Sequence, residues 1–198
     1  MTIKQEIFIS VDVETAGPIP GEYSMLTLGA CCVDDPGRTF CCSLKPINDK
    51  FVPEALEVTG LSLEELSRSA LAPEVAMRGF ATWVNSLCTQ SELPVFVGLN
   101  APFDWSFVNY YFHRFTGANP FGFTALDIKA LYMGATGCTW QDTRSSAMAR
   151  RLTPTLQGDH DALHDALYQA ELFRLIRMLI NRDNHPPKRT DFPSPPRY

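Results

Sequence analysis

The stretch EIFISVDVET, residues 6–15, joins a strand to a pair of acidic side chains near its end. Residues 6–13 carry β-branched and aromatic side chains on both faces, which is typical of a central strand covered on both sides. Asp12 and Glu14 are two positions apart, so their side chains point to the same face of a strand. Two carboxylates this close repel each other unless a cation lies between them. The stretch therefore predicts a metal site, unless the strand has already ended and both acids are solvated in the following loop.

The remaining elements extend this strand into a sheet. Residues 25–34 and 38–45 are strand-like, and the Asp-Pro-Gly turn between them predicts an antiparallel meander. Two shorter strands are predicted over residues 94–99 and 123–126. Helices are predicted over residues 62–67, 73–88, 102–115, a short segment from 127, 142–151 and 161–181. A meander followed by helices that alternate with single strands indicates an α/β fold with a mixed sheet.

Length and composition suggest the domain organisation and the location. The 198 residues suit one domain, predicted over residues 1–184, with a flexible tail over residues 185–198 that contains five prolines. No apolar run reaches the roughly 20 residues that cross a bilayer, and the N-terminus lacks the blocks of a secretory signal. A cytoplasmic location without a membrane partner is therefore expected. The six cysteines show no metal-ligand spacing, so we expect reduced, buried, apolar side chains.

The net charge of −5 narrows the class of nucleic-acid partner. Proteins that coat long duplexes usually carry a broad basic face, because their affinity comes from neutralising phosphates. An acidic enzyme can still grip a few nucleotides if bound divalent ions supply the positive charge at the phosphate.

A second acidic position follows the predicted strand over residues 94–99. Pro102 opens a helix there, and Asp104 stands in its first turn. An acid at this place suits the helix dipole, so capping alone could explain it. The functional interpretation places Asp104 at the mouth of the sheet, beside Asp12.

A third cluster is GDHDALHD, residues 158–165. Asp159 or Asp161 can cap the last helix, which accounts for one acid. Asp165 lies one turn inside the helix next to its apolar face, where an aspartate requires a cation or a hydrogen-bond donor. His160 stands at the helix entry, although histidines at such places are more often surface residues than catalysts.

Taken in order, the three clusters resemble the DEDDh family of 3′–5′ exonucleases. The matching stretches are D-x-E-T at residues 12–15, N-x-x-F-D at 100–104 and H-x-A-x-x-D at 160–165. The motif DVETAG at residues 12–17, and PEAL at 53–56 followed by TGL at 59–61, look most like the RNase T-like branch. Two positions depart from the pattern, Leu99 in place of a histidine and Ile128 in place of a threonine. Neither position is a metal ligand, so these departures bear on the assignment to a sub-branch and not on the expected activity.

The resemblance implies an RNase H-like fold, with a mixed five-stranded sheet in which parallel strands follow the meander. It implies that Asp12, Glu14, Asp104 and Asp165 hold two Mg²⁺ or Mn²⁺ ions, hard cations that prefer carboxylate oxygen. His160 would take a proton from the attacking water, since it lies five residues before Asp165 as in the His-type branch. The implied reaction releases nucleoside 5′-monophosphates from the 3′ end of single-stranded RNA or DNA.

The resemblance also implies substrate contacts. The backbone around Glu14 and Thr15 would contact the terminal sugar. Asn100, the first residue of the N-x-x-F-D motif, is a further candidate for substrate binding. Leu61 and Phe103 would pack against terminal bases, because stacking tolerates any sequence. Both could equally be core residues, which is the favoured interpretation for Phe103. A homodimer is a further expectation, because RNase T-like relatives work as homodimers.

Two alternatives come from other classes. A catalytically inactive RNase H-like module would bind nucleic acid without turnover, although all five catalytic positions are filled here. A haloacid-dehalogenase-type phosphatase also begins with two acids after a strand, but its second acid is normally Asp, whereas this chain has Glu14. That scheme gives no role to His160 or Asp165.

Overall fold

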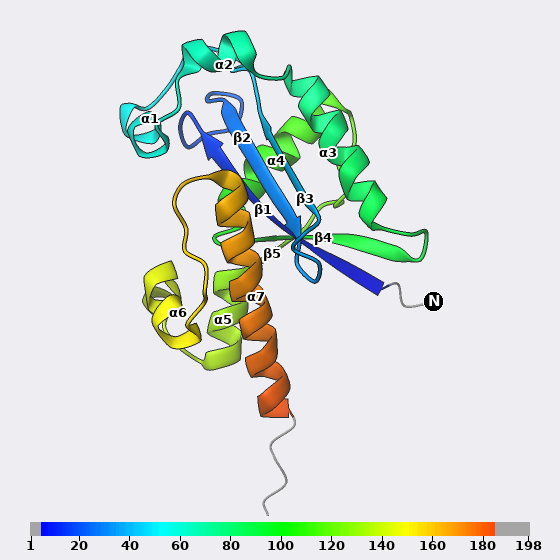
Figure 1. The fold of residues 1–198 in the computed structure, drawn as a ribbon, viewed down its shortest axis with the longest axis vertical. Helices are drawn as coiled ribbons and strands as arrows, with labels where there is room; N and C mark the ends of the chain where they lie inside the picture. Colours follow the sequence, from blue (N-terminus) through cyan, green and yellow to red (C-terminus); the bar gives the residue numbers. More distant parts are fainter. Residues whose placement is uncertain (1–4, 185–198) are drawn as a thin grey trace, which may run out of the picture.

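A computed structural model describes residues 5–184 of the chain. Its centre is a five-stranded sheet with the order β3-β2-β1-β4-β5 (Figure 1). The strands are β1 (Gln5–Thr15), β2 (Met25–Cys32), β3 (Thr39–Ser43), β4 (Glu92–Gly98) and β5 (Ala125–Asp127). The first three strands pair antiparallel, while β4 and β5 continue from β1 in parallel. The predicted sheet, a meander followed by parallel strands, is confirmed.

Helices flank the sheet, and most lie where the sequence predicts them. They are α1 (Pro53–Thr59), α2 (Leu63–Ser69), α3 (Pro73–Leu87), α4 (Pro102–Phe115), α5 (Ile128–Thr136), α6 (Ser145–Leu152) and α7 (Ala162–Asn184). The helix predicted over residues 142–151 is divided, because the 3₁₀ turn η1 (Trp140–Thr143) precedes α6. The sequence did not predict α1, which buries no residue and so has no apolar periodicity.

The central strand β1 is covered on both faces, as predicted. Ile9, Val11 and Val13 belong to the core cluster that α3 and α4 complete. The alternate residues face α7, and the ring of Phe8 lies 5.1 Å from that of Phe173. Asp12 and Glu14 share this second face because they continue the same alternation.

The last helix lies across β1 and β2, in front of the sheet in Figure 1. Gly29 of β2 permits this contact, since a Cβ atom there would lie 2.2 Å from the backbone of Ala162. Gly29 is also the register partner of Asp12. The first turn of α7 is therefore held beside the acidic end of β1.

Three expectations from composition have different outcomes. The tail predicted over residues 185–198 lies outside the described residues. Within residues 5–184, no helix has both the length and the apolar character that crossing a membrane requires. All six cysteines are free thiols, but Cys41 is exposed, contrary to the expectation of buried side chains, because it lies on the edge strand β3.

Candidate active site

The two acids of β1 lie within the strand, half-buried, and not in a solvated loop. Asp12 accepts a hydrogen bond at Oδ1 from Nε2 of Gln169, at 2.6 Å. Burial raises the pKa of Asp12 well above its usual range, and the charges of Asp104, Glu14 and Asp165 add to this effect. Burial also raises the pKa of Glu14 to about 7, again with contributions from neighbouring acids. Both groups therefore lack the positive charge that would stabilise their ionised forms.

Asp104 reaches the same place from the other face of the sheet. It lies in the first turn of α4, is 5% exposed, and accepts a hydrogen bond at Oδ1 from the backbone N–H of Val13 at 3.1 Å. Burial raises its pKa to about 7, although the N–H of Val13 acts in the opposite direction. Because the carboxyl group contacts β1, capping of α4 does not by itself account for it.

The start of α4 is held by a residue from β5. Asn100 has a left-handed backbone, with φ of 68°, and closes the turn between β4 and α4. Oδ1 of Asp127 accepts hydrogen bonds from the N–H groups of Asn100 and Ala101, at 2.9 and 3.1 Å. The same carboxylate caps α5. Asp127 thus fixes the turn from which Asp104 projects.

The third cluster, residues 158–165, lies at the start of α7. Asp161 caps this helix, because its Oδ1 accepts from the N–H groups of Leu163 and His164, both at 3.0 Å. Asp165 accepts at Oδ1 from the N–H of Asp159, at 2.9 Å, which ties the preceding loop to the helix. His160 is exposed on that loop and has a φ of 64°.

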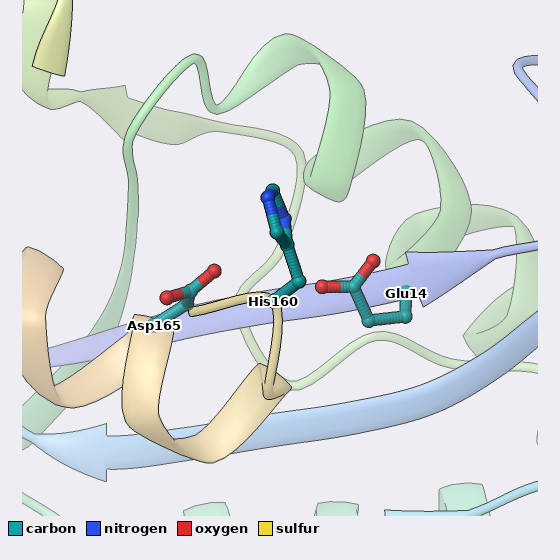
Figure 2. A group of neighbouring side chains, drawn as sticks. All are labelled: Glu14, His160 and Asp165. Atoms are coloured by element: carbon teal, nitrogen blue, oxygen red, sulfur yellow. The ribbon is translucent and has the colours of Figure 1, made fainter. Parts of the chain in front are cut away.

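These elements bring Glu14, His160 and Asp165 together. Each offers one ligand atom, and the three atoms lie within 4.8 Å of one another. Figure 2 shows His160 between the carboxylates of Glu14 on β1 and Asp165 in the first turn of α7. Residues far apart in the sequence therefore form one acidic group with an imidazole beside it.

The second histidine has a different partner. Nδ1 of His164 lies 3.0 Å from Oδ2 of Asp159, and both side chains are more than half exposed. This hydrogen bond raises the pKa of His164 above its usual value. His164 therefore belongs to a surface pair at the start of α7.

A cleft of about 600 Å³ opens beside Glu14 and His160. Leu61 lines it, as expected for a residue that contacts a base. The other predicted substrate residues do not line it: Thr15 is buried and donates its hydroxyl to Gly17 O, Phe103 packs on Phe107 in the core, and Asn100 lies at the start of α4. Phe103 is half-buried and packs against the core cluster, and a contact with a base stays a prediction.

The sequence did not point to Gln169. The residue is 3% exposed, and its amide donates to Asp12 and accepts from the N–H of Leu99 at 2.9 Å, so both ends of the amide are engaged. One turn separates it from Asp165 on α7. The only available signal was a polar residue within the apolar face of the last helix.

The group of acids is suited to hard cations. Among the side chains of residues 5–181, no lysine or arginine forms an ion pair with Asp12, Glu14, Asp104 or Asp165. Buried carboxylates without a counter-charge are costly, and divalent ions bound through oxygen would relieve that cost. Such a site favours chemistry on phosphate esters, where positive charge is needed at the reacting oxygens.

Comparison with known proteins agrees with this chemistry. A family model described as an exonuclease, RNase T, matches residues 9–173. The 3′–5′ DNA exonuclease Cap18 of Escherichia coli is 58% identical over 182 residues, which cover 92% of this chain and 97% of that protein.

Solved structures share the fold. The nuclease domain of 3′hExo, a DEDDh family member bound to rAMP, superposes with a TM-score of 0.71 at 14% identity, over 88% of this chain and 92% of that one. Exonuclease I of E. coli in complex with a dA16 oligonucleotide gives a TM-score of 0.66 at 19% identity, over 90% of this chain and 42% of the longer relative. These matches do not favour the haloacid-dehalogenase alternative.

Proposed function

The chain belongs to the RNase T family of exonucleases, and on this premise we propose that it removes nucleotides from the 3′ end of single-stranded DNA. The supporting observation is the convergence of Glu14, His160 and Asp165 beside the half-buried Asp12 and the buried Asp104. The coarse activity, 3′–5′ exonuclease on nucleic acid, follows from the family and the 58% identical relative. The preference for DNA over RNA rests on the name of that relative.

We assign the metal site to Asp12, Glu14, Asp104 and Asp165. Their carboxylates come from β1, α4 and α7 and provide oxygen ligands only, which suits Mg²⁺ or Mn²⁺. Two such ions, when bound, would stabilise the charge that develops on the attacking and leaving oxygens. Gln169 would hold the Asp12 carboxylate in place by its hydrogen bond.

His160 is the proposed general base. Its exposed imidazole stands beside Glu14 and Asp165, where an attacking water can reach it. The imidazole accepts a proton as the water oxygen bonds to phosphorus. The bond from phosphorus to the 3′ oxygen of the preceding nucleotide breaks, and that oxygen takes up a proton from solvent. The products are a nucleoside 5′-monophosphate and a strand shorter by one nucleotide.

The cleft beside Glu14 is the proposed site of the terminal nucleotide. Leu61 supplies an apolar surface for the base, which any base can contact. We place this catalytic unit in a single domain over residues 1–184, because the family match and the sheet together occupy nearly all of the described range.

A degradation ladder tests the function. A 5′-labelled single strand of DNA should shorten stepwise with Mg²⁺ or Mn²⁺, more slowly if it is RNA, and not at all in excess EDTA. A 3′-phosphate should block the reaction, and Asp165→Asn should abolish it without unfolding the protein. Internal cuts in a circular single strand would refute the exonuclease assignment, and full activity in EDTA would refute the metal site.

A further inference from the structure

A second groove lies along the segment that leads to α7. It has a volume of about 690 Å³, which is in the range of ligand pockets, and it runs between α6 and residues 154–158. Figure 1 shows this segment leading from α6 to the start of α7, and its next residues, 159–161, line the first cleft. The groove and the cleft therefore flank the same loop.

The groove begins next to the acidic site. Gly158 forms part of its wall, and a Cβ atom on Gly158 would lie 2.7 Å from Oδ1 of Asp165. Tyr168, nearly one turn after Asp165 on α7, lines it as well. The groove wall therefore lies directly beside Asp165.

The groove offers an unpaired positive charge in an acidic protein. Arg150 lines it and is exposed, and it has no ion-pair partner among the side chains of residues 5–181. Its guanidinium can therefore bind a phosphate through two N–H groups. Ser146 and Gln157 add further hydrogen-bond donors, and Leu156, at 42% exposure, adds an apolar surface for a base.

The wall opposite α6 is held in position. The carboxylate of Glu171 accepts hydrogen bonds from the N–H and hydroxyl of Thr155 and from the N–H of Leu156, at 2.8 to 2.9 Å. A groove whose wall is fixed before binding loses less entropy when a flexible strand enters it.

We propose that this groove binds the nucleotides that precede the terminal one, with Arg150 on a phosphate and Leu156 against a base. This inference rests on the proposed function, because it takes the scissile bond to lie at Asp165. It assigns a direction to the substrate: the 3′ nucleotide occupies the cleft lined by Leu61, and the 5′ portion leaves along α6.

Two substrates of different length test the proposal. The p-nitrophenyl ester of thymidine 5′-monophosphate reaches only the cleft, whereas a 20-nucleotide strand would occupy both sites. Arg150→Ala should lower the ratio of kcat/KM for the strand to kcat/KM for the ester by about tenfold, the loss of one charge-assisted contact. It should also reduce the salt dependence for the strand by about 0.7 in the log–log slope. Arg150→Lys should recover much of the loss.

Arg151→Ala is the matched control, because Arg151 is exposed on the same helix and does not line the groove. Its ratio should stay close to that of the wild type. If Arg150→Ala and Arg151→Ala behave alike, or if the ester and the strand are affected equally, the groove assignment is wrong. If the wild type cleaves neither substrate with Mn²⁺, the proposed function itself fails.

Discussion

His160 and His164 stand in the same short segment but have different surroundings. Only His160 lies with Glu14 and Asp165, while His164 pairs with Asp159. His160→Asn removes the imidazole and keeps a residue that tolerates a left-handed backbone. We expect kcat to fall on the order of 10² to 10⁴, with Mn²⁺ binding retained.

His164→Ala serves as the comparison and should stay within a few-fold of the wild type in kcat. Steady-state rates on a 5′-labelled strand, with Mn²⁺ binding measured by calorimetry, check both variants. An inactive His164→Ala together with an active His160→Asn would show that the general base has been misassigned.

Gln169 is a positioning residue for Asp12 because it bridges that carboxylate to the end of β4. Gln169→Leu keeps the volume but removes both hydrogen bonds, so Mn²⁺ should bind about 10- to 100-fold more weakly. Titration calorimetry on the intact protein measures this directly. Gln141→Leu, an exposed glutamine in η1, should leave the affinity unchanged. An unaltered Kd for Gln169→Leu would mean that its role is only structural.

The sequence predicts the acidic residues of the site but not the residues that hold them in position. Asp12, Glu14 and Asp165 can be recognised in the amino-acid sequence alone, because each is a carboxylate that interrupts an apolar pattern. Gln169 shows no such contrast, because its importance comes from contacts with two other elements that pair only after folding. The hydrogen bonds of Asp127 to the turn before α4 are non-local in the same way.

The backbones of β2 and α7 approach closely at Gly29. Gly29→Ala would place a Cβ atom against the backbone of Ala162, which cannot yield as a flexible side chain can. We expect a loss of about 1–3 kcal/mol in unfolding free energy, together with lower activity, because α7 would lift away from Asp12. Urea unfolding and steady-state rates measure the two effects.

Gly79→Ala gives the contrast. Gly79 is exposed within α3, and a Cβ atom there would meet only the ring of Phe40 at an ordinary 3.8 Å. This variant should gain roughly 0.4–1 kcal/mol of stability. Equal stability for Gly29→Ala and the wild type would show that the contact between β2 and α7 is looser than described.

The long periodic helix α7 was predictable, whereas the short helix α1 was not. The last helix was found from its apolar face, and Ala166, Ala170 and Phe173 are indeed buried. In contrast, α1 depends on Pro53 at its start and on Gly60 in a left-handed conformation after its end. Both signals were present in the sequence, but without an apolar face they did not distinguish a helix from a turn.

For the molecule as a whole, the acidic site makes stability depend on pH and on metal. The folded state raises the pKa of Asp12, Glu14 and Asp104, so it binds more protons than the unfolded state between about pH 4 and 7. The stabilising contribution of these groups is therefore complete at the low end of this window and is lost as pH rises through about 7. Divalent ions should restore it.

Asp12→Asn tests this linkage. In EDTA its Tm should match the wild type at pH 5 and exceed it at pH 8 by about 2–4 °C, the shift that roughly 1 kcal/mol produces in a domain of this size. In excess Mg²⁺ the order should reverse, because only the wild type gains the full binding energy. Asp49→Asn, at an exposed position, should follow the wild type throughout. A constant difference between the variants at all pH values would contradict the assignment of repulsion to the site.

Of the described elements, α7 is made last and closes over β1, the strand made first, and this order governs when activity can arise during synthesis. A ribosome that has reached residue 150 has made β1, the sheet and α4, but neither His160 nor Asp165. With the proposed roles, such a nascent chain has only part of its ligands and no base. Nucleic acid near the ribosome is thus protected until α7 has been made, and a message broken before that point yields an inactive product.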